Sequence, residues 1–293
     1  MQKPVMGQFE NWQDGSPWDW EKGGPYRGLT SLCYGYNIGP PNNNPGGPMT
    51  IIMGALAKGG EQVVVVSDKL TSSSILTDNI PKMRSMGPKL LVLTSGIVQN
   101  YLFLDDCGSN NKTISDVKEN VDIIAKAYRE FRLNKFQQDV LPLYGMLSLN
   151  EFYGRQKTLN DFLAGSISEQ IKIYNIWVDL IVAGIDKMGH VYHIGHPGGF
   201  SCEDVVGYCC AGSASPRSLP VFEFYRYSKD LSLEQVKLIC FFAKKRSEQM
   251  SGIGVDTEIK IISEDGITNL SAEEIKTLNG SFLKEKRKNP SFY

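Results

Sequence analysis

The predicted helices of this chain fall in groups between predicted strands, and this order constrains the fold more than any other feature of the sequence. From residue 50 onward, β-rich runs come first, two helical zones follow together, β-rich runs return, and a helix and a last strand complete the order. Single alternation of strands and helices is typical of doubly wound sheets, whereas grouped helices favour an α+β fold with packed sheets. No G-x-G-x-x-G or G-x-x-x-x-G-K-[ST] string follows a predicted strand, so the usual phosphate-binding loops are not expected. The order therefore predicts an α+β fold.

Periodicity places the individual elements. Apolar and β-branched runs predict strands at residues 50–57, 62–67, 89–95, 176–185, 190–195, 205–212 and 257–263. A helix is expected where apolar residues recur at spacings of four, three, four and three, at Val117, Val121, Ile124, Tyr128 and Phe131. A second helical stretch is expected within 149–173, and a solvated, lysine-rich helix and tail after about residue 270.

The segment 231–250 is the clearest predicted helix. Ser232 and Gln235 have the spacing of a capping box, in which each residue satisfies a free backbone amide of the other. Its expected buried face consists of Val236, Ile239, Cys240 and Ala243.

The first 48 residues differ in composition from the rest. Three of the four tryptophans occur there, and residues 39–48 are so rich in proline, glycine and asparagine that no regular element is expected. We therefore expect an N-terminal extension or propeptide with a linker at 1–49, a folded domain at 50–270 and a charged tail at 271–293.

Charge and hydropathy exclude several classes of partner. The formal net charge is −1, which gives no basic footprint for nucleic acid or anionic membrane. No apolar run approaches the roughly 18 residues needed to cross a bilayer, and the acidic start lacks a secretory signal pattern. We expect a soluble, unexported chain whose six cysteines are reduced.

Other catalytic and metal-binding patterns are weak. His190, His193 and His196 are three positions apart, so on a strand consecutive side chains point to opposite faces and a shared metal ion is not expected. No G-x-S-x-G elbow is present, and no Ser-His-Asp set can be assigned. We expect no metal and no cofactor.

Several strings after residue 49 resemble the proteasome β-type family in order and spacing. TIIMG resembles the family's opening TTTVG, EQVVVVSDK its second strand, and IPKMRSMGPKLLVLTSG the segment that carries its lysine and its glycine-ended strand. Further on, DLIVAGIDKMGHVYHIGHPGG, YCCAGSAS and residues 231–267 resemble its hairpin, its Gly-Ser loop, and its last helix and strand. Lys82 and Gly96 follow Thr50 by 32 and 46 positions (82 − 50 and 96 − 50), which matches the family spacing. The resemblance covers Thr50 to about Ile267 and implies a four-layer αββα sandwich, the fold of N-terminal-nucleophile (Ntn) hydrolases.

The resemblance also implies an amide-hydrolase site. Thr50 would be the nucleophile, and its own α-amine, once freed, would be the base. Lys82 would place an ammonium beside the hydroxyl, favouring the alkoxide and keeping the amine neutral by like-charge repulsion. Asp68 would pair with Lys82 and orient it.

The remaining residues carried over from the family would stabilise charge and bind water. The amide of Gly96 would donate to the oxyanion. Ser213 and Ser251 would form hydrogen bonds around the threonine amine and a catalytic water. Glu248 would fill the acidic position before Ser251.

The chain departs from the family pattern at three positions, and these keep alternatives open. Met49 stands where active members carry the glycine that precedes the threonine, Ile51 where they carry a second threonine, and Glu248 where they carry aspartate. The resemblance implies a threonine-type peptidase, active once the Thr50 amine is released. Release would come either from removal of the extension during assembly or, if synthesis starts at Met49, from an aminopeptidase that exposes Thr50. The alternatives are a catalytically silent subunit with an uncut extension and a transpeptidase that uses the same acyl-enzyme.

The family resemblance also implies an assembly and a location. The partners would be other proteasome α- and β-type subunits in stacked rings, and the substrates unfolded polypeptides. The location would be the cytoplasm, and also the nucleus in a eukaryote.

Overall fold

The structure, a computed structural model, describes residues 50–69, 81–110 and 116–292, without the side chains of residues 108–110. All of these residues belong to the second of the two units into which the chain divides, Gly47–Tyr293. The extension and linker expected at 1–49 lie outside the described residues.

Ten strands in the described residues form two antiparallel five-stranded sheets. The first sheet has the order β10-β9-β2-β1-β8 and the second the order β3-β4-β5-β6-β7. The strands of the first sheet are β1 Ile52–Ala57, β2 Gln62–Asp68, β8 Tyr208–Ala211, β9 Thr257–Ser263 and β10 Gly266–Asn269. Those of the second are β3 Met83–Gly87, β4 Leu90–Gly96, β5 Val178–Ile185, β6 Gly189–Gly195 and β7 Gly199–Cys202.

Seven α-helices and three short 3-10 helices complete the described part of the chain. The α-helices are α1 Phe103–Asn110, α2 Val117–Asp139, α3 Leu149–Arg155, α4 Asp161–Ile173, α5 Ser215–Phe224, α6 Leu233–Ser247 and α7 Ala272–Lys288. The 3-10 helices are η3 Lys58–Gly60, η4 Val98–Tyr101 and η5 Leu141–Tyr144.

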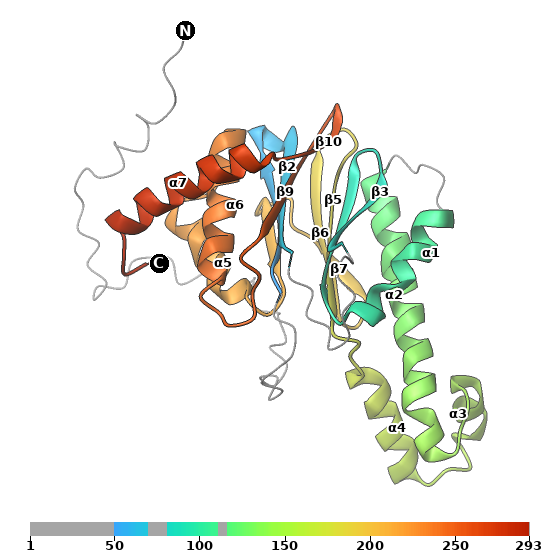
Figure 1. The fold of residues 1–293 in the computed structure, drawn as a ribbon. Coiled ribbons are helices and arrows are strands. Elements are labelled where there is room, and N and C mark those ends of the chain that lie inside the picture. The colour runs from blue at the N-terminus through green and yellow to red at the C-terminus, as the bar shows by residue number, and fades with distance from the viewer. Residues whose placement is uncertain (1–49, 70–80, 111–115, 293) are drawn as a thin grey trace, which may run out of the picture. The chain divides into compact units, whose positions relative to one another are not determined.

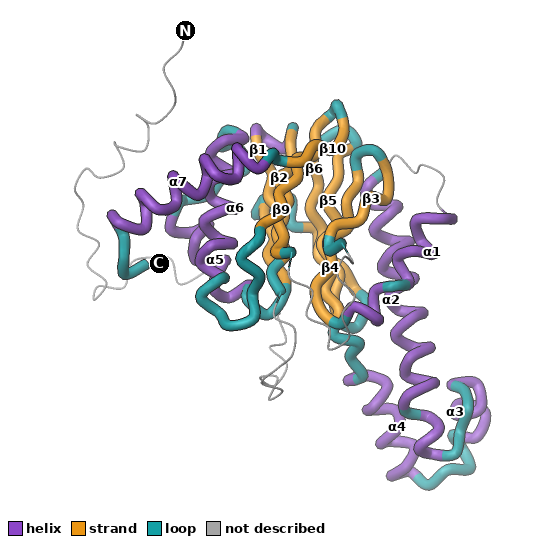
Figure 2. The backbone as a smooth tube through the Cα atoms, in the orientation of Figure 1, coloured by secondary structure: helices purple, strands orange, loops and turns teal. Residues whose placement is uncertain are grey.

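The sheets and helices of this unit lie in layers (Figures 1 and 2). Helices α5, α6 and α7 pack on the outer face of the first sheet, the two sheets face each other, and α1 and α2 pack on the outer face of the second sheet. Two antiparallel sheets with helices outside them are compatible with the predicted α+β sandwich.

The valine run in β2 shows why the sequence folds this way. Val63 and Val65 pack in the cluster between the sheets, whereas Val64 and Val66 pack in the cluster under the helices. Side chains alternate across a strand, so a strand covered on both faces needs apolar residues at every position. The uninterrupted run is therefore the signature of a strand with protein on both sides.

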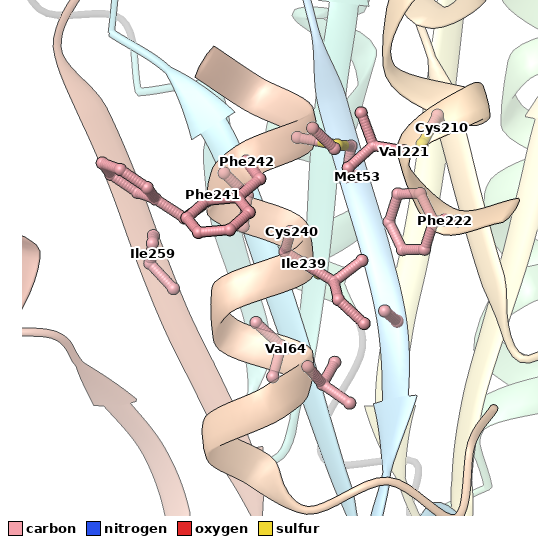
Figure 3. Close-up of a cluster of buried hydrophobic side chains, with 14 of the residues drawn as sticks. Met53, Val64, Cys210, Val221, Phe222, Ile239, Cys240, Phe241, Phe242 and Ile259 are labelled. Atoms are coloured by element: carbon pink, nitrogen blue, oxygen red, sulfur yellow. The ribbon is translucent and has the colours of Figure 1, made fainter. Parts of the chain in front are cut away.

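Helix α6 covers the middle of the first sheet (Figure 3). Its predicted capping box at Ser232 and Gln235 is present, and Val236, Ile239, Cys240 and Ala243 are all buried as predicted. Phe241 and Phe242 extend this buried surface in the same cluster. Fully burying one such aromatic side chain contributes about 1.5–3 kcal/mol, so α6 is a main anchor of this layer.

Helix α7 corresponds to the predicted lysine-rich helix, and one face of it is packed. Leu278 and Phe282 are buried in the cluster below α6, and Phe282 contacts Phe242. The expectation of a wholly solvated helix was wrong at these two positions, because they lie four residues apart and share one face.

A satellite cluster lies apart from the sheets. Phe136, at the end of α2, packs with Leu141, Met146, Phe152 and Ile167 from η5, α3 and α4. The single helical stretch predicted within 149–173 is two helices, separated at residues 156–160. Among the described helices, none combines the length and apolar character required to cross a bilayer.

Candidate active site

Thr50 lies directly before β1 and is nearly fully buried, with 3 % of its surface exposed. Its backbone N–H donates to Ser213 Oγ over 3.2 Å, and its carbonyl accepts from the amide of Ala214 over 3.4 Å. Ser213 belongs to the short connection between β8 and α5. The structure therefore brings together two predicted site residues that are 163 positions apart.

Asp68 and Lys82 form a buried ion pair, and its carboxylate contacts the backbone of Ile51, the residue after Thr50. Lys82 Nζ donates to Asp68 Oδ1 over 2.8 Å, and the same oxygen accepts from the amide of Ile51 over 3.1 Å. The side chains of Asp68 and Lys82 are 0 % and 6 % exposed. The carboxylate thus holds the ammonium in place and fixes the backbone beside Thr50.

Burial also changes the acidity of Lys82. Loss of water lowers the pKa of its ammonium below the ordinary value of 10.5, and the charge and hydrogen bond of Asp68 act in the opposite direction. Lys82 therefore loses a proton more readily than a surface lysine, and shifted pKa values of this kind cluster at functional sites.

Gly212 allows the backbone of the β8–α5 connection to approach the backbone of Thr50 closely. Its φ is +100°, and a Cβ atom built on it would lie 2.3 Å from the carbonyl oxygen of Thr50 and 2.8 Å from Ser95 Oγ. Only glycine fits this contact, because any side chain would overlap the Thr50 backbone. The glycine of the AGSAS string therefore has a steric role.

The amide of Gly96 faces the edge of β4 on which Lys82 lies. Two residues earlier, the Thr94 amide donates to the carbonyl of Lys82 over 2.8 Å, whereas the Ile97 amide donates to Trp177 on the opposite side. Amides of alternate residues in an antiparallel strand point to the same edge. The Gly96 N–H therefore points in the same direction as the Thr94 N–H, toward the edge of β4 next to Lys82. Gly96 has a φ of +113°, and a Cβ there would be 1.9 Å from the Trp177 carbonyl oxygen.

Ser251 and Glu248 are less directly connected to Thr50. Ser251 is exposed in a turn after α6. Glu248 accepts a hydrogen bond from Lys244 and lies 3.0 Å from Lys245. Within the residues that the structure describes, no hydrogen bond or ion pair joins either side chain to Thr50, Asp68 or Lys82.

Two residues missed by sequence reasoning also belong to this region. The amide of Gly254 donates to Asp68 Oδ2 over 3.3 Å, and Lys244 is a fully buried lysine whose Nζ donates to the Gly254 carbonyl. A lysine on the strongly apolar face of α6 was the available signal, because lysine is almost never fully buried without partners.

His190 and His193 have separate surroundings. His190 lies between Asp204 and Asp186, at 2.6 Å and 3.2 Å, whereas His193 contacts Asp179 at 3.3 Å. Over the described ranges, no group of three or more His, Cys, Asp and Glu residues could hold a metal ion.

A comparison with characterised proteins finds a relative of this chain. This relative is 32 % identical to the chain over 118 residues. It is the proteasome subunit beta of Thermoplasma acidophilum. The match covers 39 % of this chain and 54 % of the Thermoplasma proteasome β subunit, so the chain spans about half the length of this relative. No family model matches the chain. The similarity to the proteasome β subunit supports a proteasome-like family.

Proposed function

We propose that the chain is a proteasome β-type subunit whose residues 50–270 form the four-layer αββα sandwich of Ntn hydrolases. The layered packing of helices and sheets supports this assignment, as does the similarity to the Thermoplasma proteasome β subunit. In this proposal, residues 1–49 are a propeptide and residues 271–293 a charged tail.

We further propose that Thr50 is the nucleophile of a threonine-type endopeptidase. The observation that carries this proposal is the buried Asp68–Lys82 pair, whose carboxylate also binds the amide of Ile51. A buried ion pair is costly to desolvate and gives little net stability compared with apolar residues, so its position beside Thr50 favours a chemical role.

The chemistry follows from the neighbours of Thr50. Its hydroxyl oxygen attacks the substrate carbonyl while its free α-amine, or a water bound to it, takes the proton. The Lys82 ammonium stabilises the developing alkoxide, and the Gly96 amide donates to the oxyanion of the tetrahedral intermediate. Collapse of this intermediate, with the proton passed from the α-ammonium to the leaving nitrogen, expels the amine product and leaves an acyl-enzyme. Water then hydrolyses this ester, which releases the carboxylic acid and restores the Thr50 hydroxyl. Ser213 and Ser251 would orient the amine and this water.

Activity then depends on the Met49–Thr50 peptide bond, because an uncut chain has no free amine at Thr50. A second candidate function, a silent structural subunit, is favoured by one observation: both side-chain oxygens of Glu248 are occupied by lysines. In that case the site residues would maintain the fold, and the uncut extension would remain in place.

For either function we propose assembly with other proteasome α- and β-type subunits in stacked rings in the cytoplasm. Enclosure within such rings would restrict an active subunit to unfolded polypeptide substrates.

The test combines processing with labelling of the purified full-length protein and its assembled particle. Intact mass and N-terminal sequencing should find a chain that begins at Thr50. A β-lactone, which acylates a hydroxyl, and an epoxyketone, which closes a ring on a hydroxyl and a free amine, should both modify Thr50. Thr50→Ala should abolish labelling and peptide hydrolysis, whereas Thr277→Ala, at an exposed position of α7 outside the candidate site, is the control and should change neither. A chain that begins only at Met1 and is not labelled would identify the silent subunit.

A further inference from the structure

Lys244 is a charged residue in an apolar layer, with 0 % of its side chain exposed. It lies in the last turn of α6, which otherwise packs apolar residues against the first sheet. A buried ammonium without partners is strongly destabilising, so Lys244 needs hydrogen-bond acceptors within this layer.

All the hydrogen-bonding capacity of the Lys244 ammonium is used. Nζ donates to the carbonyl oxygens of Gly254 and Val255 over 2.7 Å and 2.9 Å, and to the carboxylate of Glu248. An ammonium has three N–H donors, and these contacts match that number. Two of the three acceptors belong to the segment between α6 and β9, so Lys244 fixes the path of this segment.

Gly254, the residue held by Lys244, also contacts the candidate site. The carbonyl of Gly254 accepts from Lys244, whereas the amide of the same residue donates to Asp68 Oδ2 over 3.3 Å. Asp68 Oδ1 accepts from Lys82 over 2.8 Å. A continuous chain of hydrogen bonds therefore runs from Lys244 through Gly254 and Asp68 to Lys82.

We infer that Lys244 is a positioning residue of the candidate site, which holds Gly254 so that its amide fixes the second oxygen of Asp68. With both oxygens fixed, Asp68 presents Oδ1 to Lys82 in one orientation. The catalytic consequence rests on the proposed function of Thr50, whereas the link from Lys244 to Lys82 does not.

Glu248 then has a role other than direct contact with Thr50. It is the counter-ion of Lys244, and Lys245 binds the same carboxylate at 3.0 Å. Burial lowers the pKa of the Lys244 ammonium, and the hydrogen bond and charge of Glu248 oppose this shift. The Lys245 side chain is 16 % exposed, and none of its described hydrogen bonds reaches Gly254 or Val255.

The test uses the full chain and three forms of it. Lys244→Met removes the ammonium, and Lys244→Met with Glu248→Gln removes it without leaving an unpaired buried charge, in case the single variant does not fold. Lys245→Met is the matched control, because it removes a contact with Glu248 but none with Gly254.

Two readouts do not require an active threonine. Hydrogen exchange of the peptide that contains Gly254 should accelerate about tenfold or more in the Lys244 variants and stay unchanged in Lys245→Met. In the double variant, which keeps the net charge of the native protein, the titration midpoint of Lys82, followed by NMR with labelled lysine, should fall by about half a unit or more, because Asp68 is no longer fixed against the ammonium and opposes the effect of burial less. Lys82→Arg assigns the signal.

The outcomes separate this inference from the proposed function. Faster exchange at Gly254 together with a shifted Lys82 midpoint supports a positioning role, even if Thr50 of the unmodified protein is never labelled by a β-lactone. Unchanged exchange, or faster exchange with an unchanged Lys82 midpoint, overturns it, even if labelling of Thr50 is efficient. If Thr50 is labelled, its rate should fall about tenfold in the double variant and its pH profile should move with the Lys82 midpoint.

Discussion

The ammonium of Lys82 lies 2.8 Å from a carboxylate oxygen of Asp68, and both side chains are withdrawn from water. The same oxygen binds the Ile51 amide, so the pair connects the start of β1 with the start of β3. Removing either partner alone therefore affects both charge and backbone geometry.

Asp68→Asn should lower the free energy of unfolding by about 3 kcal/mol at pH 7, because it leaves Lys82 as a buried charge with a weaker partner. The folded-state pKa of Lys82 is already below 10.5, so the unfolded state binds more protons between the lowered value and 10.5. The stability of the variant should therefore rise with pH through this window. Urea unfolding at pH 7 and pH 10 measures both effects.

Two further variants control this prediction. Asp68→Asn combined with Lys82→Met should be less destabilising than the sum of the single changes, because no buried charge remains. Asp122→Asn breaks the exposed pair with Lys118 and should leave the unfolding midpoint nearly unchanged. Additive behaviour of Asp68 and Lys82 would contradict a coupled pair.

Gly212→Ala should destabilise the protein by about 3 kcal/mol, because it combines a positive φ with a close contact to the Thr50 carbonyl. Gly154→Ala is the matched control, because Gly154 lies in α3 with open space around its Cβ position. That control should be neutral or stabilising by up to about 1 kcal/mol, since alanine favours a helix. Equal thermal unfolding temperatures for the two variants would disprove the steric role of Gly212.

His190→Gln should destabilise the protein most in mildly acidic solution, by about 1 kcal/mol for this partly exposed contact. The hydrogen bond to Asp204 is the main cause that raises the pKa of His190 above 6.5, with burial opposing it and Asp186 assisting. The stabilisation is complete below 6.5 and is lost as pH rises through the higher folded-state pKa.

At acidic pH, the stabilisation by His190 is limited by the protonation of Asp186 and Asp204. The pKa values of Asp186 and Asp204 are lowered from 3.8, with hydrogen bonds outweighing burial, so their contribution is lost as pH falls below that value. Unfolding curves at pH 5 and pH 9 test the prediction. A stability difference between native protein and His190→Gln that grew towards pH 9 would reverse the sign and refute it.

Phe152→Ala should unfold the satellite cluster without disturbing the candidate site. Phe152 is fully buried among residues of η5, α3 and α4 and the end of α2, and its loss should cost about 3–5 kcal/mol locally. Hydrogen exchange should increase in residues 141–173, whereas residues 50–68 should keep their protection. Phe241→Ala, in the cluster that covers β1 and β2, should show the opposite pattern.

Sequence patterns predicted the long elements well because their periods are complete. The unbroken valine run of β2, the apolar stripe of α2 and the capping box of α6 are each complete signals for one type of element, and these elements are confirmed. Shorter elements were missed: β3, β7 and β10 contain four or five residues, too few for a clear period. Helix α5 was missed because Pro216 and Pro220 lie within it, and α1 because its glycine and polar residues resemble a loop.

The candidate site was predicted unevenly for a related reason. Thr50, Asp68, Lys82 and Ser213 were found by resemblance and are close in the structure, yet no local pattern could show that Lys82 would be buried. Strand pairing within the first sheet brings Thr50, Asp68 and Ser213 together, whereas Lys82 precedes β3 of the second sheet, so its position depends on packing between the sheets, which is a long-range property. The contacts of Lys244 and Glu248 depend on the path of the α6–β9 connection, which sequence spacing does not determine.

The placement of β1 has a consequence for any chain end created at Thr50. Both neighbours of β1, β2 and β8, consist of residues that follow Thr50, and Ile52 is paired on each side, with Ser67 and with Ala211. Breaking the chain before Thr50 would therefore remove none of the residue pairs that join β1 to β2 and β8. A new terminus is ordinarily a frayed end, but this one would emerge from the interior of a sheet with its position already set.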